Sequence, residues 1–142
     1  MKEKKSGFTL LEILIILIIV GVLAGIAMPQ LFKNVESARS SEAMESIGVI
    51  KRSIEACAMS FNNDFSTCTN FANIGMTDPS YNATINAGAH FSYMITTAAT
   101  TFQIVATRNT VDNGTSGDTV VFARAANGSV TRSGTTAFAG IQ

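Results

Sequence analysis

The sequence predicts an α+β fold, in which one long N-terminal helix with a transmembrane first half packs on a small antiparallel sheet of about four strands. Three observations support this prediction. Residues 8–28 form an apolar run whose only charged residue is Glu12. Apolar residues then recur at helical steps of three and four up to residue 61. Residues 90–133 contain short alternating runs separated by turn signals, a pattern typical of strands.

The composition differs between an apolar N-terminal segment and the rest of the chain. Of its 142 residues, 46% are hydrophobic and 14% are charged, and the formal net charge is zero. This charge balance does not favour nucleic-acid binding. Most of the excess hydrophobicity lies in residues 8–28, and the rest of the chain is an ordinary mixed sequence rich in Thr, Ala, Asn, Gly and Ser. A chain of this length suits one domain.

The apolar run is long enough to cross a membrane. It follows a short basic segment, MKEKKSG, and positive charge before an apolar stretch favours a cytoplasmic N-terminus. A helix over residues 8–28, at about 1.5 Å per residue, spans the roughly 30 Å hydrocarbon core of a bilayer. An ordinary secretory signal peptide is an alternative, because small-residue cleavage sites end at Ala24 and Ala27. The mature chain would then be a secreted binding domain.

Pro29 directly follows the apolar run. Proline removes one backbone donor and disfavours helix at the preceding residue, and Gly21 and Gly25 lie within two turns upstream. This stretch is therefore predicted to bend or to melt locally. The helix as a whole is predicted to run from about Thr9 to about Ser60. The buried face of its second half is predicted to comprise Ala43, Ile47, Ile50, Ile54, Cys57 and Phe61.

Beyond the helix, the chain is predicted to form a loop, a sheet and a short tail. The loop covers residues 62–89 and is expected to pack on the head through Phe65, Phe71, Ile74 and Tyr81. The sheet covers residues 90–133, with strands at 90–97, 101–108, 119–124 and 129–133, and the tail covers 134–142. Cys57 and Cys68 are expected to form one disulfide in an exported head. Two reduced thiols or a two-cysteine metal site remain the alternatives.

The sequence shows no pattern that predicts catalysis or a cofactor. It has no Ser/His/Asp set, phosphate-binding loop or pair of carboxylates, and no metal or cofactor site is predicted. The turn Asp112-Asn113-Gly114 with Asp118 matches no calcium motif. His90 has no acidic residue nearby in the sequence and is interpreted as structural. Three arginines lie at or near strand ends and are interpreted as solvated rims rather than a DNA-binding patch: Arg108, Arg124 and Arg132.

The segment Gly7-Phe8-Thr9-Leu10-Leu11-Glu12 resembles the processing and assembly motif of type IV prepilins and pseudopilins. The resemblance continues through the apolar run to Pro29, where many of these proteins have a helix-bending proline. It implies that Gly7 is the last residue of a leader removed by a prepilin peptidase. It also implies that Phe8 becomes an N-methylated N-terminus and that Glu12 is needed for assembly.

Physical chemistry gives Glu12 two possible roles. A carboxylate in a bilayer costs on the order of 2.5–3.5 kcal/mol on insertion scales, so it needs a compensating partner. In one interpretation, Glu12 is satisfied within its own helix, near the Phe8 amine and the positive end of the helix dipole. In the other, Glu12 of an incoming subunit pairs with the Phe8 amine of a subunit already in a filament.

The expected domains are therefore a leader at residues 1–7, a transmembrane and filament-core segment at 8–28, and a head at 29–142. The expected function is that of a pilin, a structural subunit of a type IV pilus or pilus-like filament. A pseudopilin of a type II secretion or DNA-uptake system is the nearest alternative. Expected partners are further copies of the chain, a prepilin peptidase/methyltransferase, an assembly platform and the inner membrane, with no nucleic acid. The precursor is expected in the inner membrane, and the assembled protein in an extracellular filament.

Overall fold

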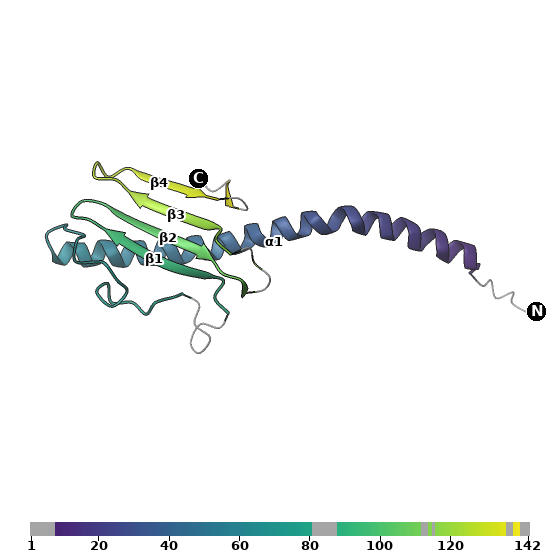
Figure 1. The fold of residues 1–142 in the computed structure, drawn as a ribbon, viewed down its shortest axis with the longest axis horizontal. Coiled ribbons are helices and arrows are strands. Elements are labelled where there is room, and N and C mark those ends of the chain that lie inside the picture. Colours follow the sequence, from purple (N-terminus) through teal and green to yellow (C-terminus); the bar gives the residue numbers. More distant parts are fainter. Residues whose placement is uncertain (1–7, 81–87, 112–113, 115, 136–137, 140–142) are drawn as a thin grey trace, which may run out of the picture. The chain divides into compact units, whose positions relative to one another are not determined.

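The computed structural model contains one long helix and one four-stranded antiparallel sheet (Figure 1), which confirms the predicted α+β fold. It describes residues 8–80, 88–111, 114, 116–135 and 138–139. The elements are α1 (Leu10–Ser60), β1 (Phe91–Thr97), β2 (Phe102–Arg108), β3 (Thr119–Arg124) and β4 (Val130–Gly134). The chain divides into two compact units, Met1–Val35 and Glu36–Gln142, hereafter the N-terminal unit and the head unit. Residues of α1 contribute to both.

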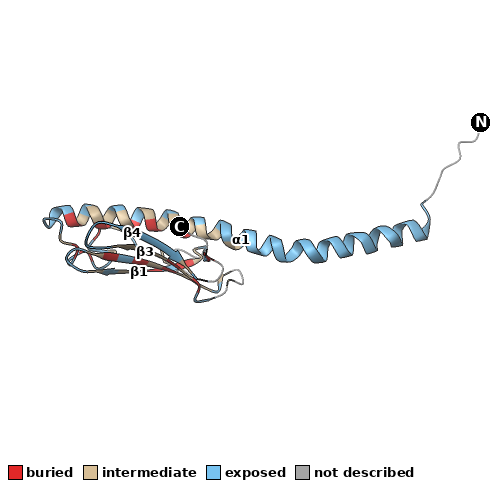
Figure 2. Cartoon of the chain, turned by 90° about the horizontal axis from the view of Figure 1, so that it is seen from above, coloured by how far each residue is buried: buried red, intermediate tan, exposed pale blue. Residues whose placement is uncertain are grey.

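The core of the head unit lies between α1 and one face of the sheet (Figure 2). On α1 the buried residues are Ala43, Ile47, Ile50, Ile54 and Ala58. Four of the six predicted face residues are therefore buried, and Cys57 is partly buried. Phe61 was predicted on this face, but 51% of it is exposed. The helix ends at Ser60, so the next residue leaves the helical register and Ala58 completes the face instead.

Two asparagines end α1 by adopting left-handed backbone conformations. Asn62 has φ 56° and Asn63 has φ 64°, and asparagine tolerates this region better than most residues. The Asn63 amide donates to the Ala58 carbonyl at 2.8 Å, which satisfies one of the acceptors left free at the helix end. The chain then turns back toward the sheet, where the Phe65 amide donates to the Ala99 carbonyl at 3.2 Å.

A disulfide joins Cys57 in α1 to Cys68 in the following loop, with an S–S distance of 1.99 Å. It ties the loop to the helix across 11 residues of sequence. Cys68, Phe65 and Ile74 are buried in the core, and Phe71 packs against it, so the loop contributes apolar contacts as expected. Tyr81, the fourth residue predicted to do so, lies outside the described residues.

The sheet is a meander in which each strand pairs with its neighbours in sequence, in the order β1-β2-β3-β4. The alternation of its strands gives one buried face, formed by Phe91, Tyr93, Phe102, Ile104, Ala106, Val120 and Phe122. In β4 the pattern is different, because Val130 to Ser133 are all exposed. Arg132 lies opposite Phe122 in the register, and its guanidinium carbon is 5.9 Å from the centre of that ring.

The C-terminal segment contributes to the core, although it was predicted to be a tail of small residues. Phe138 is 2% exposed, and its ring centre lies 5.7 Å from that of Phe91. The segment returns to the sheet through the Thr135 amide, which donates to the Thr119 carbonyl at 3.0 Å. A single aromatic residue gives no periodic signal, so the sequence pattern did not reveal this contact.

Candidate assembly site on the N-terminal helix

Residues 10–28 of α1, in the N-terminal unit, present a largely apolar surface on all sides. The large apolar side chains between Leu10 and Ile26 are 45% to 84% exposed. No residue of this apolar stretch is buried within the chain. By length and composition this part of α1 is able to cross a membrane. A helix that is apolar all round requires an apolar environment, which is either lipid or other helices.

Glu12, the only charge in this apolar run, forms a capping box with Thr9. The Glu12 amide donates to the Thr9 side-chain oxygen at 3.2 Å. In return, the Thr9 amide and hydroxyl each donate to Glu12 Oε2 at 3.4 Å. This reciprocal arrangement satisfies donors that the first helical turn leaves free. Sequence reasoning missed the role of Thr9, although a Thr followed three residues later by Glu is a known helix-start signal.

The capping box leaves the Glu12 carboxylate with unused capacity. Both bonds to Oε2 are long, and an ionised carboxylate offers about four acceptor positions in total. Phe8, the residue before Thr9, is 78% exposed. Glu12 therefore remains able to accept a donor from outside its own helix. Gly7, the residue predicted to precede the cleavage point, lies outside the described residues.

Pro29 lies inside α1, and the helix continues through it without interruption. The predicted local melting is therefore wrong for the described structure, while the predicted bend remains a prediction. Because Pro29 has no amide proton, the carbonyl one turn earlier, at Gly25, lacks its usual helical partner. No heavy atom would lie within 4 Å of a Cβ added to Gly21 or Gly25, so neither glycine is required by crowding in this chain.

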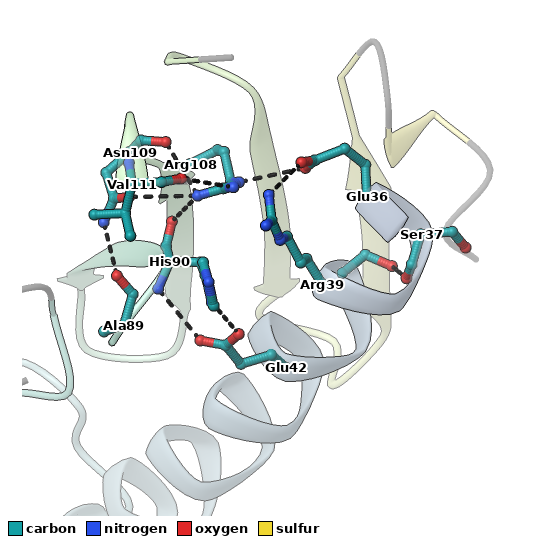
Figure 3. A network of polar contacts seen from close by, with 10 residues as sticks. Glu36, Ser37, Arg39, Glu42, Ala89, His90, Arg108, Asn109 and Val111 are labelled. Atoms are coloured by element: carbon teal, nitrogen blue, oxygen red, sulfur yellow. Dashed lines mark hydrogen bonds and ion pairs between the residues drawn. The ribbon is translucent and has the colours of Figure 1, made fainter. Parts of the chain in front are cut away.

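A buried arginine joins the head-unit part of α1 to the sheet (Figure 3). Arg108, at the end of β2, is 1% exposed, so its interpretation as a solvated rim residue is wrong. Its Nε donates to Glu36 Oε2 at 3.3 Å, and its Nη atoms donate to the carbonyls of His90, Asn109 and Val111 at 3.0 to 3.1 Å. These partners compensate the burial of the charge. The partner on α1 is 72 residues away in sequence.

Glu36 is the carboxylate that links two arginines. It accepts from Arg39 at 2.7 Å as well as from Arg108. Partial burial alone would raise the pKa of Glu36, but the hydrogen bonds and charges of Arg108 and Arg39 together hold that pKa below its ordinary value of 4.5. Glu36 is therefore charged at neutral pH and stabilises the buried guanidinium.

His90 also contacts α1, through Glu42, an acidic residue 48 positions earlier in the sequence. Its Nδ1 lies 2.7 Å from Glu42 Oε2, and its backbone amide donates to Glu42 Oε1 at 3.3 Å (Figure 3). These contacts agree with a structural role for His90.

Arg124 and Arg132, the other two arginines interpreted as solvated rims, lie against aromatic rings. The Arg124 guanidinium carbon is 5.0 Å from the Phe65 ring centre, and Arg132 contacts Phe122.

The described part of the chain contains no group of three or more His, Cys, Asp or Glu side chains placed to hold a metal ion. Asp112 and Asn113, from the turn considered for calcium, lie outside it. The Asp118 carbonyl accepts from the Arg108 amide at 2.7 Å, so this residue takes part in the β2–β3 connection. The candidate functional site is the exposed apolar part of α1 with its single carboxylate, Glu12.

Comparisons with known proteins match the segment in which this helix begins. Residues 2–28 match the family model of the prokaryotic N-terminal methylation motif. The chain is 37% identical over 59 residues to a type IV major fimbrial protein FimA of Dichelobacter nodosus, covering 42% of this chain and 38% of the relative. It is 33% identical over 66 residues to a type II secretion system core protein G of Aeromonas hydrophila, covering 46% of each chain.

A type II secretion system core protein G of Escherichia coli strain K12 is 38% identical over 53 residues, which cover 37% of each chain. The chain thus spans less than half the length of these curated relatives. The resemblance noted in the sequence is confirmed, and it includes both fimbrial proteins and type II secretion proteins. The chain carries the N-terminal methylation motif of prokaryotic prepilin-like proteins and is similar to type IV fimbrial subunits and type II secretion pseudopilins.

Proposed function

We propose that this protein is a structural subunit that polymerises through α1 into a type IV pilus or a pilus-like filament. One observation carries the proposal. An exposed apolar helix begins within a methylation motif and holds a single carboxylate, Glu12, that its own helix satisfies only with long hydrogen bonds. Such a helix is suited to lipid before assembly and to contacts with other helices afterwards.

The proposed maturation begins with cleavage after Gly7 by a prepilin peptidase at the cytoplasmic side of the inner membrane. Cleavage makes the Phe8 amine the new N-terminus, which is then N-methylated and remains a cation. This cation is the donor that we propose for Glu12 of a neighbouring subunit. In the low dielectric of a bundle of apolar helices, opposite charges attract more strongly than in water. The pairing would align each incoming subunit with one already assembled.

Assembly exchanges lipid contacts for protein contacts along the apolar helix. Because lipid tails are also apolar, the exchange gains little hydrophobic free energy, and packing between helices must supply the stabilisation. Extraction from the bilayer therefore requires work, which an assembly platform would perform. In this proposal the precursor resides in the inner membrane and the assembled subunit in an extracellular filament. The protein is a substrate of processing enzymes and is itself no enzyme.

Substitution of Glu12 tests the proposal in cells that express the full chain. We expect Glu12→Gln and Glu12→Ala each to reduce the yield of sheared surface filaments at least tenfold, while the membrane pool of the chain is retained. Glu55→Gln is a matched control, since Glu55 pairs with Lys51 on the head-unit part of α1, at 2.9 Å. Normal filament yield from both Glu12 variants would refute the role of the carboxylate.

The N-terminus of the mature chain provides a second test. Methylated Phe8 is the expected result. A mature chain that begins at Gly25 or Met28 would instead support a secreted binding domain, because those residues follow the two possible signal-peptidase sites.

A pseudopilin of a secretion system is a second candidate, because the chain is similar to core protein G as well as to FimA. Abundance separates the two functions. We expect the chain to dominate the protein of sheared surface filaments if it is a pilin. A pseudopilin would be absent from that fraction, and its deletion would reduce the export of a secreted protein without loss of surface filaments.

A further inference from the structure

Two charged residues of α1 in the head unit have no partner among the described residues. Four other charged side chains on this part of the helix form ion pairs within the chain, and a fifth, Glu42, contacts the His90 ring: the four are Glu36, Arg39, Lys51 and Glu55. In contrast, the side chains of Glu45 and Arg52 make no hydrogen bond or ion pair with any residue that the structure describes. Both residues are exposed. This face of α1 therefore offers one negative and one positive charge that the described head leaves available.

The spacing of the two charges places them on the same face. Glu45 and Arg52 are seven residues apart, which is close to two helical turns, or about 10.5 Å along the axis. Val49 lies between them at helical steps of four and three, and it is 39% exposed. The face, defined as Glu45, Val49 and Arg52, thus has an apolar centre with opposite charges at its two ends.

A groove next to this face has a lining suited to an arginine. It lies in the head unit and is lined by Glu45, Ser46, Val49, Met76 and Pro79. Arginine has an apolar stem and a charged tip, so it packs best where apolar walls meet a carboxylate. In this groove Val49, Met76 and Pro79 provide the apolar walls and Glu45 provides the carboxylate. The lining of the groove therefore matches the chemistry of an arginine side chain, which Arg52 has.

We infer that the groove binds Arg52 of a second copy of this chain, and that this contact joins neighbouring heads in the filament. The inference rests on the proposed function, because it requires parallel copies displaced along a common axis. A displacement of about 10.5 Å brings Arg52 of one copy level with Glu45 of the next. Each copy then uses Arg52 toward one neighbour and Glu45 toward another. Such a head-to-tail contact does not close on itself and extends into an open filament.

Charge complementarity of this kind determines register more than it determines affinity. An isolated pair of exposed charges contributes little, but reversal of one charge places two like charges at every such contact in the filament. The repulsion therefore recurs at every contact between neighbouring subunits along the filament. Reversal of both charges restores attraction, because the glutamate introduced at position 52 of one copy would then face the lysine introduced at position 45 of the next. The spacing and the neighbouring Val49 would be unchanged.

Charge reversal in the full-length chain tests the inference. Glu45→Lys and Arg52→Glu are each expected to reduce the yield of sheared filaments at least tenfold, and the double variant is expected to recover to within about threefold of wild type. The matched control exchanges Lys51 and Glu55, which pair with each other on the same helix at 2.9 Å, and should preserve the yield. Wild-type yield from both single variants, or a double variant no better than either, would overturn the inference.

Cross-linking distinguishes failure of this contact from failure of the proposed function. Cells that express Glu45→Cys and Arg52→Cys chains together are treated with a short bismaleimide, and a covalent dimer is expected in the filament fraction. Neither variant expressed alone should give that dimer. If the wild-type chain forms filaments but the co-expressed cysteine variants give no dimer, the contact is overturned and the filament role remains intact. If the wild-type chain forms no filaments at all, both proposals are refuted.

Discussion

Replacement of Arg108 by methionine should destabilise the head more than the same replacement at any exposed arginine. The side chain is 1% exposed and donates to Glu36 and to the carbonyls of His90, Asn109 and Val111. Methionine retains much of the apolar stem but none of the donors. The variant would leave three carbonyls without this donor and Glu36 without one of its two arginines.

The expected loss of stability follows from these contacts. Removal of one partner of a buried ion pair costs about 3–5 kcal/mol, because the remaining polar groups lose their compensation. Glu36 is 24% exposed and keeps Arg39 at 2.7 Å, which favours the lower end of that range. A loss of about 3 kcal/mol corresponds to a decrease in melting temperature of roughly 12 °C or more for a domain of about 100 residues.

Scanning calorimetry of the purified full chain in detergent, with the disulfide intact, measures this change. Arg132→Met is the matched control, since Arg132 is exposed on β4 and its contact with the Phe122 ring would be lost. A contact of that kind at an exposed site contributes about 0.5–1 kcal/mol. If Arg108→Met lowers the melting temperature no more than Arg132→Met, the buried network does not stabilise the head and the argument is refuted.

Three further predictions concern the head. Joint replacement of Cys57 and Cys68 by serine should cost about 3 kcal/mol in urea unfolding, because the bond restricts the unfolded chain, and an unchanged midpoint would contradict this. The depressed pKa of Glu36 stabilises the fold above its ordinary value of 4.5, and this contribution is lost as pH falls through the lower folded-state pKa. Acidification should therefore destabilise wild type more than Glu36→Gln in unfolding titrations. Phe138→Ala should reduce the free energy of unfolding by about 3–5 kcal/mol, because it leaves a cavity in the core. Phe61→Ala, at an exposed site, should reduce it much less, and equal effects would disprove the packing role of Phe138.

Local patterns in the sequence were sufficient to predict the secondary structure. The helix was expected from about Thr9 to about Ser60 and is observed as Leu10–Ser60. The strand at 119–124 has the predicted bounds, and the other three differ by one residue at one or both ends. Such patterns succeed because helical and strand periodicity each place apolar residues on one face within a short window. The capping box of Thr9 and Glu12 was predictable in the same local way, although it was overlooked.

The errors arose where a residue depends on a distant partner. Arg108 was expected in solvent, and its carboxylate partner lies 72 residues earlier on α1. His90 was assigned no acidic partner, yet Glu42 contacts it from 48 residues away. For both residues the environment depends on which elements meet, and no short window of sequence contains that information. Phe61 is a local error of a different kind, because it continued the helical pattern of apolar residues although the backbone leaves the helix before it.

The sequence by itself determined the α+β class and the position of the apolar helix, because composition and periodicity are properties of neighbouring residues. The motif that begins at Gly7 and includes Glu12 was identified by its resemblance to those of type IV prepilins and pseudopilins. Only the tertiary structure decided which charges are satisfied within the chain. Packing of α1 on the sheet buries Arg108 against Glu36 and leaves Glu45 and Arg52 exposed, without partners in the part of the chain that the structure describes. The physical reason is that a charge is stabilised by the groups around it in space, and the fold brings those groups together from distant parts of the chain.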